Sequence, residues 1–396
     1  MKLAPVQQVG GILDQRAGVC LESEWGHASI LLGGGHICRL TTRHRPDLNP
    51  LWRPPWGTID PQQYSPAEYE GEFGPPPDGR LLAGIAGHSL SFDYFGPPSP
   101  EETAAGLSTH GEAPATMWQV FREIQEEQPG IEYGVSLPTA QIDFRRTLRL
   151  DSKHPVLYCE ERARNLSRAD RPICWNEHVT IGPPFLECGR TVVDMPAIRG
   201  KVINASYSAA MKLVPDAEFQ WPNAPLEGGG THDLRTTPDG SYGRYTAQLL
   251  DRSHEIGYVA ISNARAGLLL VYLFRRSDFP WVGNWEERFY RQTRPWAGKT
   301  FCRGLEFSTT PFAVPRRQTI SEGPLFHEST FHWLTALAEI TVRYMALMVD
   351  IPSDFAGMEE ISVDDAEVII REWDSGRMVR VPANGRFVTE TAVGQQ

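Results

Sequence analysis

Short segments in which apolar and polar residues alternate recur along the whole chain. A period of two is typical of a β-strand with one buried face, and glycine or proline separates most of these segments. With 36 glycines and 32 prolines among 396 residues, long helices are disfavoured. Alternation is clearest at residues 140–150, 155–163, 258–262, 267–274 and 340–349. We therefore predict an all-β chain built from two packed antiparallel sheets.

No repeat and no linker-like composition divides the sequence, so residues 1–396 are expected to form a single large domain. Residues 46–80 interrupt the strand pattern, because their prolines exclude long regular elements. Aromatic residues lie between those prolines. We predict a loop-rich insertion that either forms one wall of a pocket or covers a sheet. A short helix is expected after Ser99, with Pro100 at its first position and Glu102 completing a capping box.

The charge and cysteine content exclude several classes of function. A formal net charge of -11 disfavours nucleic acid and anionic membranes as partners, whereas a neutral sugar is compatible with it. Six cysteines without a CxxC pair favour free thiols over a zinc site, and no metal or cofactor is expected. Residues 1–8 lack the apolar run of a secretory signal, so a cytoplasmic location is expected. The oligomeric state stays open.

Two histidines stand in contexts that suit a binding or catalytic site. His178 is followed by β-branched residues, which predict a strand that would hold the ring rigidly. His110 lies beside Gly111 and Glu112 in a predicted turn. A single histidine in either context is more often structural than catalytic, so the convergence of these stretches on one pocket is a hypothesis.

A carboxylate late in the chain could serve as a general base. Glu306 lies on a predicted strand with aromatic neighbours, where burial would raise its pKa. The alternative is a structural salt bridge with Arg303, if both side chains occupy one strand face. Trp285 and Asn284 precede this strand and could contact a sugar or belong to the core and its rim. Asp233 could support a site or cap a turn.

The order of three motifs resembles the galactose mutarotase-like (aldose 1-epimerase) superfamily. They are Thr109–Glu112, Asn176–His178 and Gly304–Glu306. The resemblance covers most of residues 15–350, and the stretches from 219 to 235 and from 279 to 287 are similar to a bacterial branch of mutarotase-like proteins. The chain departs from the family pattern near residues 90–93, directly after His178, and at the 46–80 insertion.

The resemblance implies a β-supersandwich that binds a hexose on one concave sheet. It implies that Glu306 removes the proton of the anomeric hydroxyl, that His178 protonates the ring oxygen, and that His110 orients the sugar. The expected substrate-binding residues are Glu112, Asn176, Asp233, Trp285, Asn284 and Arg303. Opposite charges on Glu306 and His178 would favour each other, so we expect both to be charged near neutral pH. The acid limb of a bell-shaped profile would then report Glu306 and the basic limb His178.

Three functions remain compatible with the sequence. The first is an aldose 1-epimerase, or mutarotase, that needs neither metal nor cofactor. The second is a non-catalytic carbohydrate-binding protein of the same fold, and the third is an isomerase or lyase acting on a modified sugar. An enzyme is favoured if Glu306 and His178 face one pocket. A binding protein is favoured if either is buried in a salt bridge.

Overall fold

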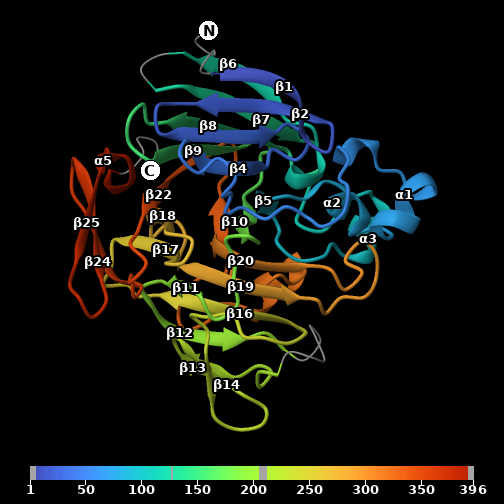
Figure 1. The fold of residues 1–396 in the computed structure, drawn as a ribbon. Coiled ribbons are helices and arrows are strands. Elements are labelled where there is room, and N and C mark those ends of the chain that lie inside the picture. Colours follow the sequence, from blue (N-terminus) through green and yellow to red (C-terminus); the bar gives the residue numbers. More distant parts are fainter. Residues whose placement is uncertain (1–5, 126–127, 205–211, 391–396) are drawn as a thin grey trace.

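The computed structural model describes residues 6–125, 128–204 and 212–390. Residues 1–5, which belong to the stretch that lacks a secretory signal, lie outside this part of the chain. Strands dominate, and the prediction of an all-β chain with packed antiparallel sheets is confirmed (Figure 1). That residues 1–396 form a single domain stays a prediction.

The larger sheet has twelve strands and places β10 near its middle. Its order is β1-β2-β3-β4-β5-β10-β20-β19-β16-β12-β13, with β21 also paired to β10. Its strands are β1 (Val6–Leu13), β2 (Arg16–Glu22), β3 (Gly26–Leu31), β4 (Ile37–Thr42), β5 (His88–Asp93), β10 (Arg171–Ile181), β12 (Ala197–Val202), β13 (Glu218–Gln220), β16 (Tyr242–Leu250), β19 (Trp281–Arg288), β20 (Phe301–Ser308) and β21 (His332–Leu334). β10 pairs in antiparallel register with β5, with β20 and, at its first residues, with β21.

The smaller sheet has eight strands in the order β11-β17-β18-β22-β9-β8-β7-β6. Its strands are β6 (Gln119–Ile124), β7 (Gly130–Leu137), β8 (Ile142–Leu150), β9 (Val156–Asn165), β11 (Thr191–Asp194), β17 (Ile256–Asn263), β18 (Leu268–Arg275) and β22 (Glu339–Asp350). Buried and half-buried residues alternate along β8, as its sequence predicts. Each neighbouring pair in this sheet is antiparallel.

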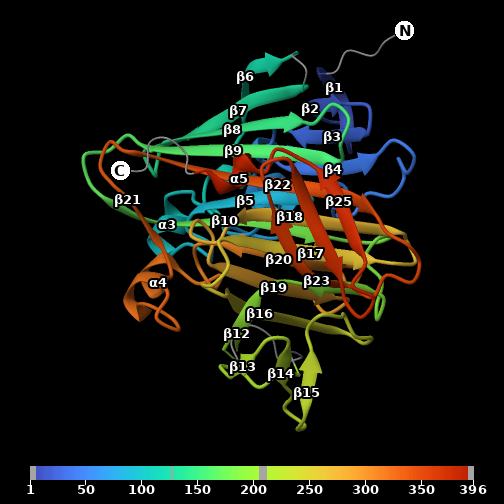
Figure 2. The same cartoon turned by 90° about the vertical axis from the view of Figure 1, so that its left-hand side faces the viewer.

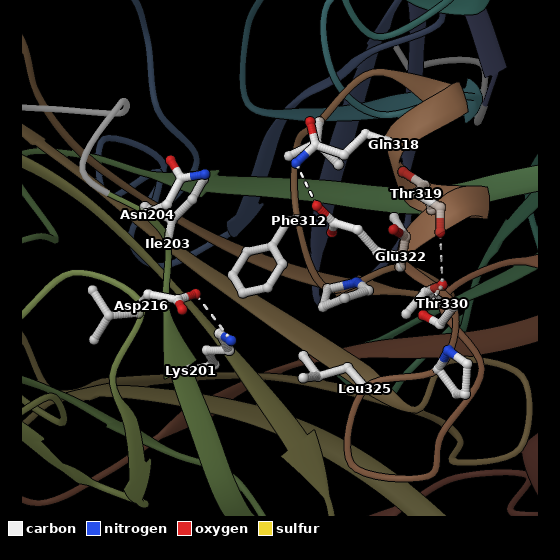
Figure 3. A pocket seen from close by; sticks show the side chains of 16 residues that line it. Lys201, Ile203, Asn204, Asp216, Phe312, Gln318, Thr319, Glu322, Leu325 and Thr330 are labelled. Atoms are coloured by element: carbon white, nitrogen blue, oxygen red, sulfur yellow. Dashed lines mark hydrogen bonds and ion pairs between the residues drawn. The ribbon is translucent and has the colours of Figure 1, made fainter.

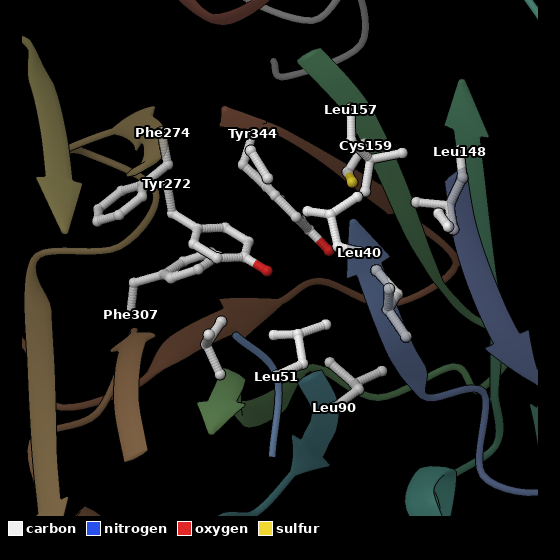
Figure 4. Packing of buried hydrophobic residues seen from close by; sticks show 14 of the residues in the cluster. Leu40, Leu51, Leu90, Leu148, Leu157, Cys159, Tyr272, Phe274, Phe307 and Tyr344 are labelled. Atoms are coloured by element: carbon white, nitrogen blue, oxygen red, sulfur yellow. The ribbon is translucent and has the colours of Figure 1, made fainter. Parts of the chain in front are cut away.

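The hydrophobic core lies between the two sheets. Figure 4 shows side chains from strands of both sheets pointing toward one another. Phe307 of β20 stacks on Phe274 of β18 with ring centroids 4.5 Å apart, and both side chains are fully buried. Leu305, two residues before Phe307, occupies the same core. Because successive strand residues face opposite sides, Glu306 points away from this core.

Two smaller sheets complete the fold. The C-terminal sheet contains β23 (Met358–Val363), β24 (Glu367–Glu372) and β25 (Met378–Pro382), and α5 (Arg386–Thr389) follows it. It packs through a second apolar cluster against β17, β18 and β22 (Figure 2). The other is a hairpin of β14 (Asn223–Pro225) and β15 (Thr231–Asp233).

The insertion at 46–80 contains short helices where the sequence predicts loops. They are η1 (Pro61–Gln63), α1 (Pro66–Phe73) and the first residues of α2 (Gly79–Gly84). Pro66 stands at the start of α1, where a missing backbone N–H costs nothing. The remaining helices are α3 (Pro100–Ala104), η2 (Ala113–Ala115) and α4 (Arg316–Glu322). The predicted capping box of α3 is present, because Ser99 and Glu102 each accept the other's backbone N–H.

Candidate active site

A cavity of about 430 Å³ opens on the face of the larger sheet that points away from the core. The size is in the range of small-molecule sites. Its floor consists of side chains from the central strands: His178, Tyr245, Trp285 and Glu306. Its walls come from α2, from the loop that carries His110, from the segment after β19, and from the start of α4. β10 is therefore buried on both faces, against the core on one side and beneath this cavity on the other.

His178 and Glu306 are direct partners across β10 and β20. His178 Nε2 lies 3.2 Å from Glu306 Oε1, and the two side chains are 5% and 1% exposed. Within the described residues, Glu306 Oε1 has no well-aligned hydrogen-bond partner. A buried carboxyl oxygen in that state costs free energy unless something supplies a hydrogen bond. Glu306 Oε1 can therefore accept a hydrogen bond from a ligand hydroxyl group in the cavity.

Burial removes the charge from both members of this pair near neutral pH. It raises the pKa of Glu306 to about 8, against which contacts with the Tyr245 hydroxyl and the Asn176 amide act. Burial, with a smaller contribution from His110, holds the pKa of His178 well below 6.5. The expectation that opposite charges stabilise each other is wrong here, because loss of hydration is the larger effect. The pair keeps one proton at neutral pH, and the carboxyl group holds it.

The hydrogen bonds of His178 fit this assignment. His178 Nδ1 lies 3.0 Å from Thr180 Oγ1, which can accept the Nδ1 proton of a neutral imidazole. The Nε2 atom, which lies 3.2 Å from Glu306 Oε1, then keeps its lone pair. Thr180 follows His178 by two positions, so the strand places both side chains on one face.

His110 is brought to the same cavity by a strained turn. It has φ of 69°, a left-handed conformation that few non-glycine residues adopt. Its Nδ1 lies 2.7 Å from the Phe95 carbonyl oxygen, and its ring stacks on the Phe95 ring. Burial lowers the pKa of His110 to about 4, so the neutral ring donates from Nδ1 and keeps Nε2 as an acceptor. The rings of His110 and His178 are 5.3 Å apart.

Two glycines leave the space in which the Glu306 carboxyl group lies. A Cβ atom at Gly304 would lie 2.6 Å from Glu306 Oε1. A Cβ atom at Gly283, which pairs with Glu306 across the sheet, would lie 2.0 Å from the Tyr245 hydroxyl. That hydroxyl is 3.5 Å from Glu306 Oε2. Any other residue at these positions would displace groups on the cavity floor.

We expect Gly304→Ala to displace the Glu306 carboxyl group, and so to lower by about 10- to 100-fold any reaction rate that depends on this group, with little loss of stability. The new methyl group would push the movable end of Glu306 rather than backbone. The measurement is kcat together with the unfolding midpoint, beside Gly57→Ala, where a Cβ meets no atom within 4 Å. Wild-type kcat in Gly304→Ala would show that the position of the carboxyl group is not critical.

Tryptophans form one side of the cavity. Trp285 and Trp296 both line it, with ring centroids 6.0 Å apart. Trp52 and Trp56, from the insertion, pack on Trp296 at 6.4 and 5.1 Å. The insertion contributes to a wall of the cavity, since Asp78 also lines it, and it covers the end of β10, since the Trp52 N–H donates to the Thr180 carbonyl oxygen.

Other predicted substrate-binding residues lie elsewhere. Arg303 is three positions before Glu306 and so lies on the opposite face of β20, which excludes the alternative salt bridge. Its Nε donates to Asn284 Oδ1 at 2.9 Å, and both side chains are buried away from the cavity. Glu112 accepts the backbone N–H groups of Thr139 and Ala140 outside the cavity.

The last two predicted residues, Asp233 and Asn176, lie at different distances from the His178–Glu306 pair. Asp233 is exposed and accepts the Arg235 N–H at 2.8 Å, the turn role left open by the sequence. Asn176 precedes His178 by two positions and is close enough to lower the pKa of Glu306. Of the nine predicted site residues, His110, His178, Trp285 and Glu306 line the cavity. The sequence did not single out Tyr245 or Phe95, although Tyr245 belongs to a strand-like run.

A buried ionic cluster supports β10 from its core face. Arg146 Nη2 donates to Glu177 Oε2 at 3.0 Å, and Arg146 also pairs with Glu161. His88 Nε2 lies 2.8 Å from the same Glu177 oxygen, and burial lowers the pKa of His88 to about 3, so its ring is a neutral donor. Removing Arg146 would leave the buried carboxyl groups of this cluster without their cation, at a cost of about 3–5 kcal/mol. The cluster joins β5, β8, β9 and β10, and so fixes the strand that carries His178.

Residues 6–125, 128–204 and 212–390 contain no group of three or more His, Cys, Asp or Glu side chains placed to hold a metal ion. The same part of the chain contains no helix that is long and apolar enough to cross a membrane.

Comparison with known proteins places this geometry in a known fold. No protein-family model matches the chain, and no curated protein matches it in sequence. A candidate aldose 1-epimerase from Klebsiella pneumoniae matches with a TM-score of 0.61 and 13% identity, over 85% of this chain and 80% of that one. A galactose mutarotase-like protein from Clostridium acetobutylicum matches with a TM-score of 0.57 and 14% identity, over 87% and 98%. A candidate aldose 1-epimerase from Escherichia coli K12 has a TM-score of 0.55 and 10% identity, over 87% and 100%. The chain therefore has the fold of the galactose mutarotase-like superfamily.

Proposed function

We propose that the protein is an aldose 1-epimerase that interconverts the two anomers of a sugar. The observation that carries this proposal is the His178–Glu306 pair on the cavity floor, 3.2 Å apart and holding one proton. Anomerisation needs one group that takes a proton from the anomeric hydroxyl and another that gives a proton to the ring oxygen. Both oxygens are bonded to C1, so the two groups that serve them must be close neighbours.

In the proposed reaction Glu306 removes the proton from the hydroxyl on C1. The C1–O5 bond breaks, its electron pair goes to O5, and His178 delivers a proton to that oxygen. The resulting aldehyde rotates about C1–C2, and the reverse steps close the ring as the other anomer. His110 Nε2 accepts a hydrogen bond from a sugar hydroxyl, and Trp285 packs on an apolar face of the ring.

Glu306 holds a proton in the protein without sugar, and this does not conflict with its role as the base. A protonated Glu306 with neutral His178 carries the same number of protons as an ionised Glu306 with protonated His178. A bound sugar supplies hydroxyl groups in place of the water that the cavity excludes, and these stabilise the charged form. A rate that depends on the one-proton form therefore has the same pH limits, whichever member holds the proton.

The pH dependence of kcat/KM is expected to be bell-shaped. Below the pKa of His178, which lies well under 6.5, both members are protonated and no base remains. Above about 8, the pKa of Glu306, the pair loses its proton and no acid remains. The limbs are thus the reverse of the assignment expected from the sequence. Initial anomerisation rates, corrected for spontaneous mutarotation, measure this; a basic limb that survives unshifted in Glu306→Gln would contradict it.

The direct test is an anomer-exchange assay by NMR or polarimetry over a panel of aldoses. Exchange above the spontaneous rate supports the epimerase. A carbohydrate-binding protein would bind sugars in the same cavity without accelerating exchange, and that result would overturn the proposal.

A further inference from the structure

A second cavity of about 270 Å³ lies beside the first. The two share four wall residues, which are Ile203, Asn204, Val314 and Gln318. The second cavity lies between the end of β12 and the segment that contains α4 (Figure 3). A ligand in the first cavity could therefore extend into the second past these shared residues.

An aromatic contact connects the second cavity to the catalytic pair. Phe312 lines the second cavity, and its ring centroid is 6.2 Å from that of Tyr245, which is on the floor of the first. The Tyr245 hydroxyl lies 3.5 Å from Glu306 Oε2. The Tyr245 side chain therefore contacts both Phe312 in the second cavity and Glu306 in the first.

The side chains of the second cavity suit a neutral polyol. Figure 3 shows Phe312 between two polar pairs, Lys201–Asp216 at 2.9 Å and Gln318–Glu322 at 2.7 Å. A flat ring flanked by donors and acceptors can pack on the apolar face of a sugar and bond its hydroxyls. These pairs contain one cation and two carboxylates, so their charge disfavours a phosphate or carboxylate group.

We propose that the second cavity is a subsite for a second sugar unit, and that the substrate is a reducing disaccharide or longer oligosaccharide. The reducing-end ring, which carries the free anomeric hydroxyl, lies over His178 and Glu306. The next ring lies on Phe312 between the two polar pairs. This inference rests on the proposed function, because it takes the first cavity as the site of anomer exchange.

The experiment compares anomer-exchange rates for lactose, maltose and cellobiose with those for galactose and glucose. We expect kcat/KM for the best disaccharide to exceed that of its reducing-end monosaccharide by about 10-fold or more. Phe312→Leu keeps most of the volume but loses the flat ring, and Lys201→Met keeps the stem but loses the ammonium group. Lys201→Met should lower the disaccharide kcat/KM by about 5- to 10-fold and leave the monosaccharide value within two-fold. Phe312→Leu should lower the disaccharide value by a similar factor and the monosaccharide value less, because Phe312 also contacts Tyr245 on the floor of the first cavity.

Arg199→Met is the matched control, because Arg199 lies two positions before Lys201 on β12 and forms its own ion pair with Glu218 outside the second cavity. It should change neither value. Equal effects of Phe312→Leu and Lys201→Met on both sugar classes, or no preference for a disaccharide in rate and in binding, would overturn the subsite.

Binding separates this proposal from the one on which it rests. Isothermal titration of each sugar into wild type measures affinity without turnover. Tighter disaccharide binding that Lys201→Met removes, with no anomer exchange, would support the subsite and overturn the epimerase. Monosaccharide exchange without any disaccharide preference would do the reverse.

Discussion

Glu306→Gln is expected to lower anomer exchange by about 10²- to 10⁴-fold. Glutamine keeps the size and the hydrogen bonding of the protonated carboxyl group but cannot take a proton from the anomeric hydroxyl. Because the change removes chemistry rather than contacts, kcat should fall and the affinity for the sugar should stay within a few fold. The measurement is the exchange rate by NMR at pH 7, with affinity by titration.

Glu112→Gln is the matched control, because it is the same glutamate-to-glutamine change at a residue that lies outside the cavity. It should retain near wild-type rates. If Glu306→Gln also retained them, Glu306 would have no part in the reaction.

Glu306→Gln is also expected to change the stability of the folded protein. Folding raises the pKa of Glu306 from about 4.5 to about 8, so the folded state binds this proton more tightly than the unfolded state. The associated stabilisation is complete below about pH 4.5 and is lost as pH rises to about 8, at up to about 1.4 kcal/mol per pH unit. Glutamine cannot ionise, so Glu306→Gln should become more stable than wild type as pH rises. Denaturant unfolding at pH 5 and pH 8 measures this difference, and a stability difference between variant and wild type that does not change between these pH values would show that folding does not raise the pKa of Glu306.

His178→Asn is the second variant with a large expected effect. It should lower the rate by about 10²- to 10⁴-fold, because asparagine can bond to the ring oxygen but cannot deliver a proton. Sugar affinity should stay within a few fold. The remaining activity depends on Glu306 alone as a base, so it should rise as pH passes about 8, where the wild type loses activity. The measurement is initial rate against pH for both proteins.

His110→Asn distinguishes the two histidines. Asparagine tolerates the left-handed backbone at this position, so the turn should persist. Because His110 is proposed to bind rather than to transfer a proton, this variant should raise KM and keep a bell-shaped profile. If His178→Asn kept the wild-type profile and His110→Asn lost it, His110 would be the acid.

Strands were predictable where only one of their faces is buried. In β8 the outward residues are half exposed, so apolar and polar residues alternate. β10 shows no such alternation, because its outward face carries the polar floor of a cavity. There the β-branched residues after His178 gave the correct assignment. Arg146 occupies a core-facing position of β8, where the alternation predicts an apolar residue. A charged residue at such a position is a signal from which the buried ionic cluster could have been inferred.

The chemistry of the candidate site could be predicted from the sequence, whereas the set of residues that form it could be predicted only in part. His178 and Glu306 are 128 positions apart, and only the register of β10 and β20 makes them partners. Strand parity places Arg303 behind the sheet, which its spacing from Glu306 already implied. The charge states could not be inferred from residue types, because they depend on how completely the cavity floor is dehydrated.

The division of the cavity into a floor of strands and walls of connecting segments affects how its selectivity can change. His178 and Glu306 are fixed by hydrogen-bonded neighbours on both sides, whereas Asp78, Trp296 and Gln318 belong to chain segments outside the strands. Insertions and replacements are tolerated far better in such segments than within a paired strand. Sugar preference can therefore diverge through these segments while proton transfer is preserved, and exchanging the walls is the natural route to engineering a different substrate range on the same sheet.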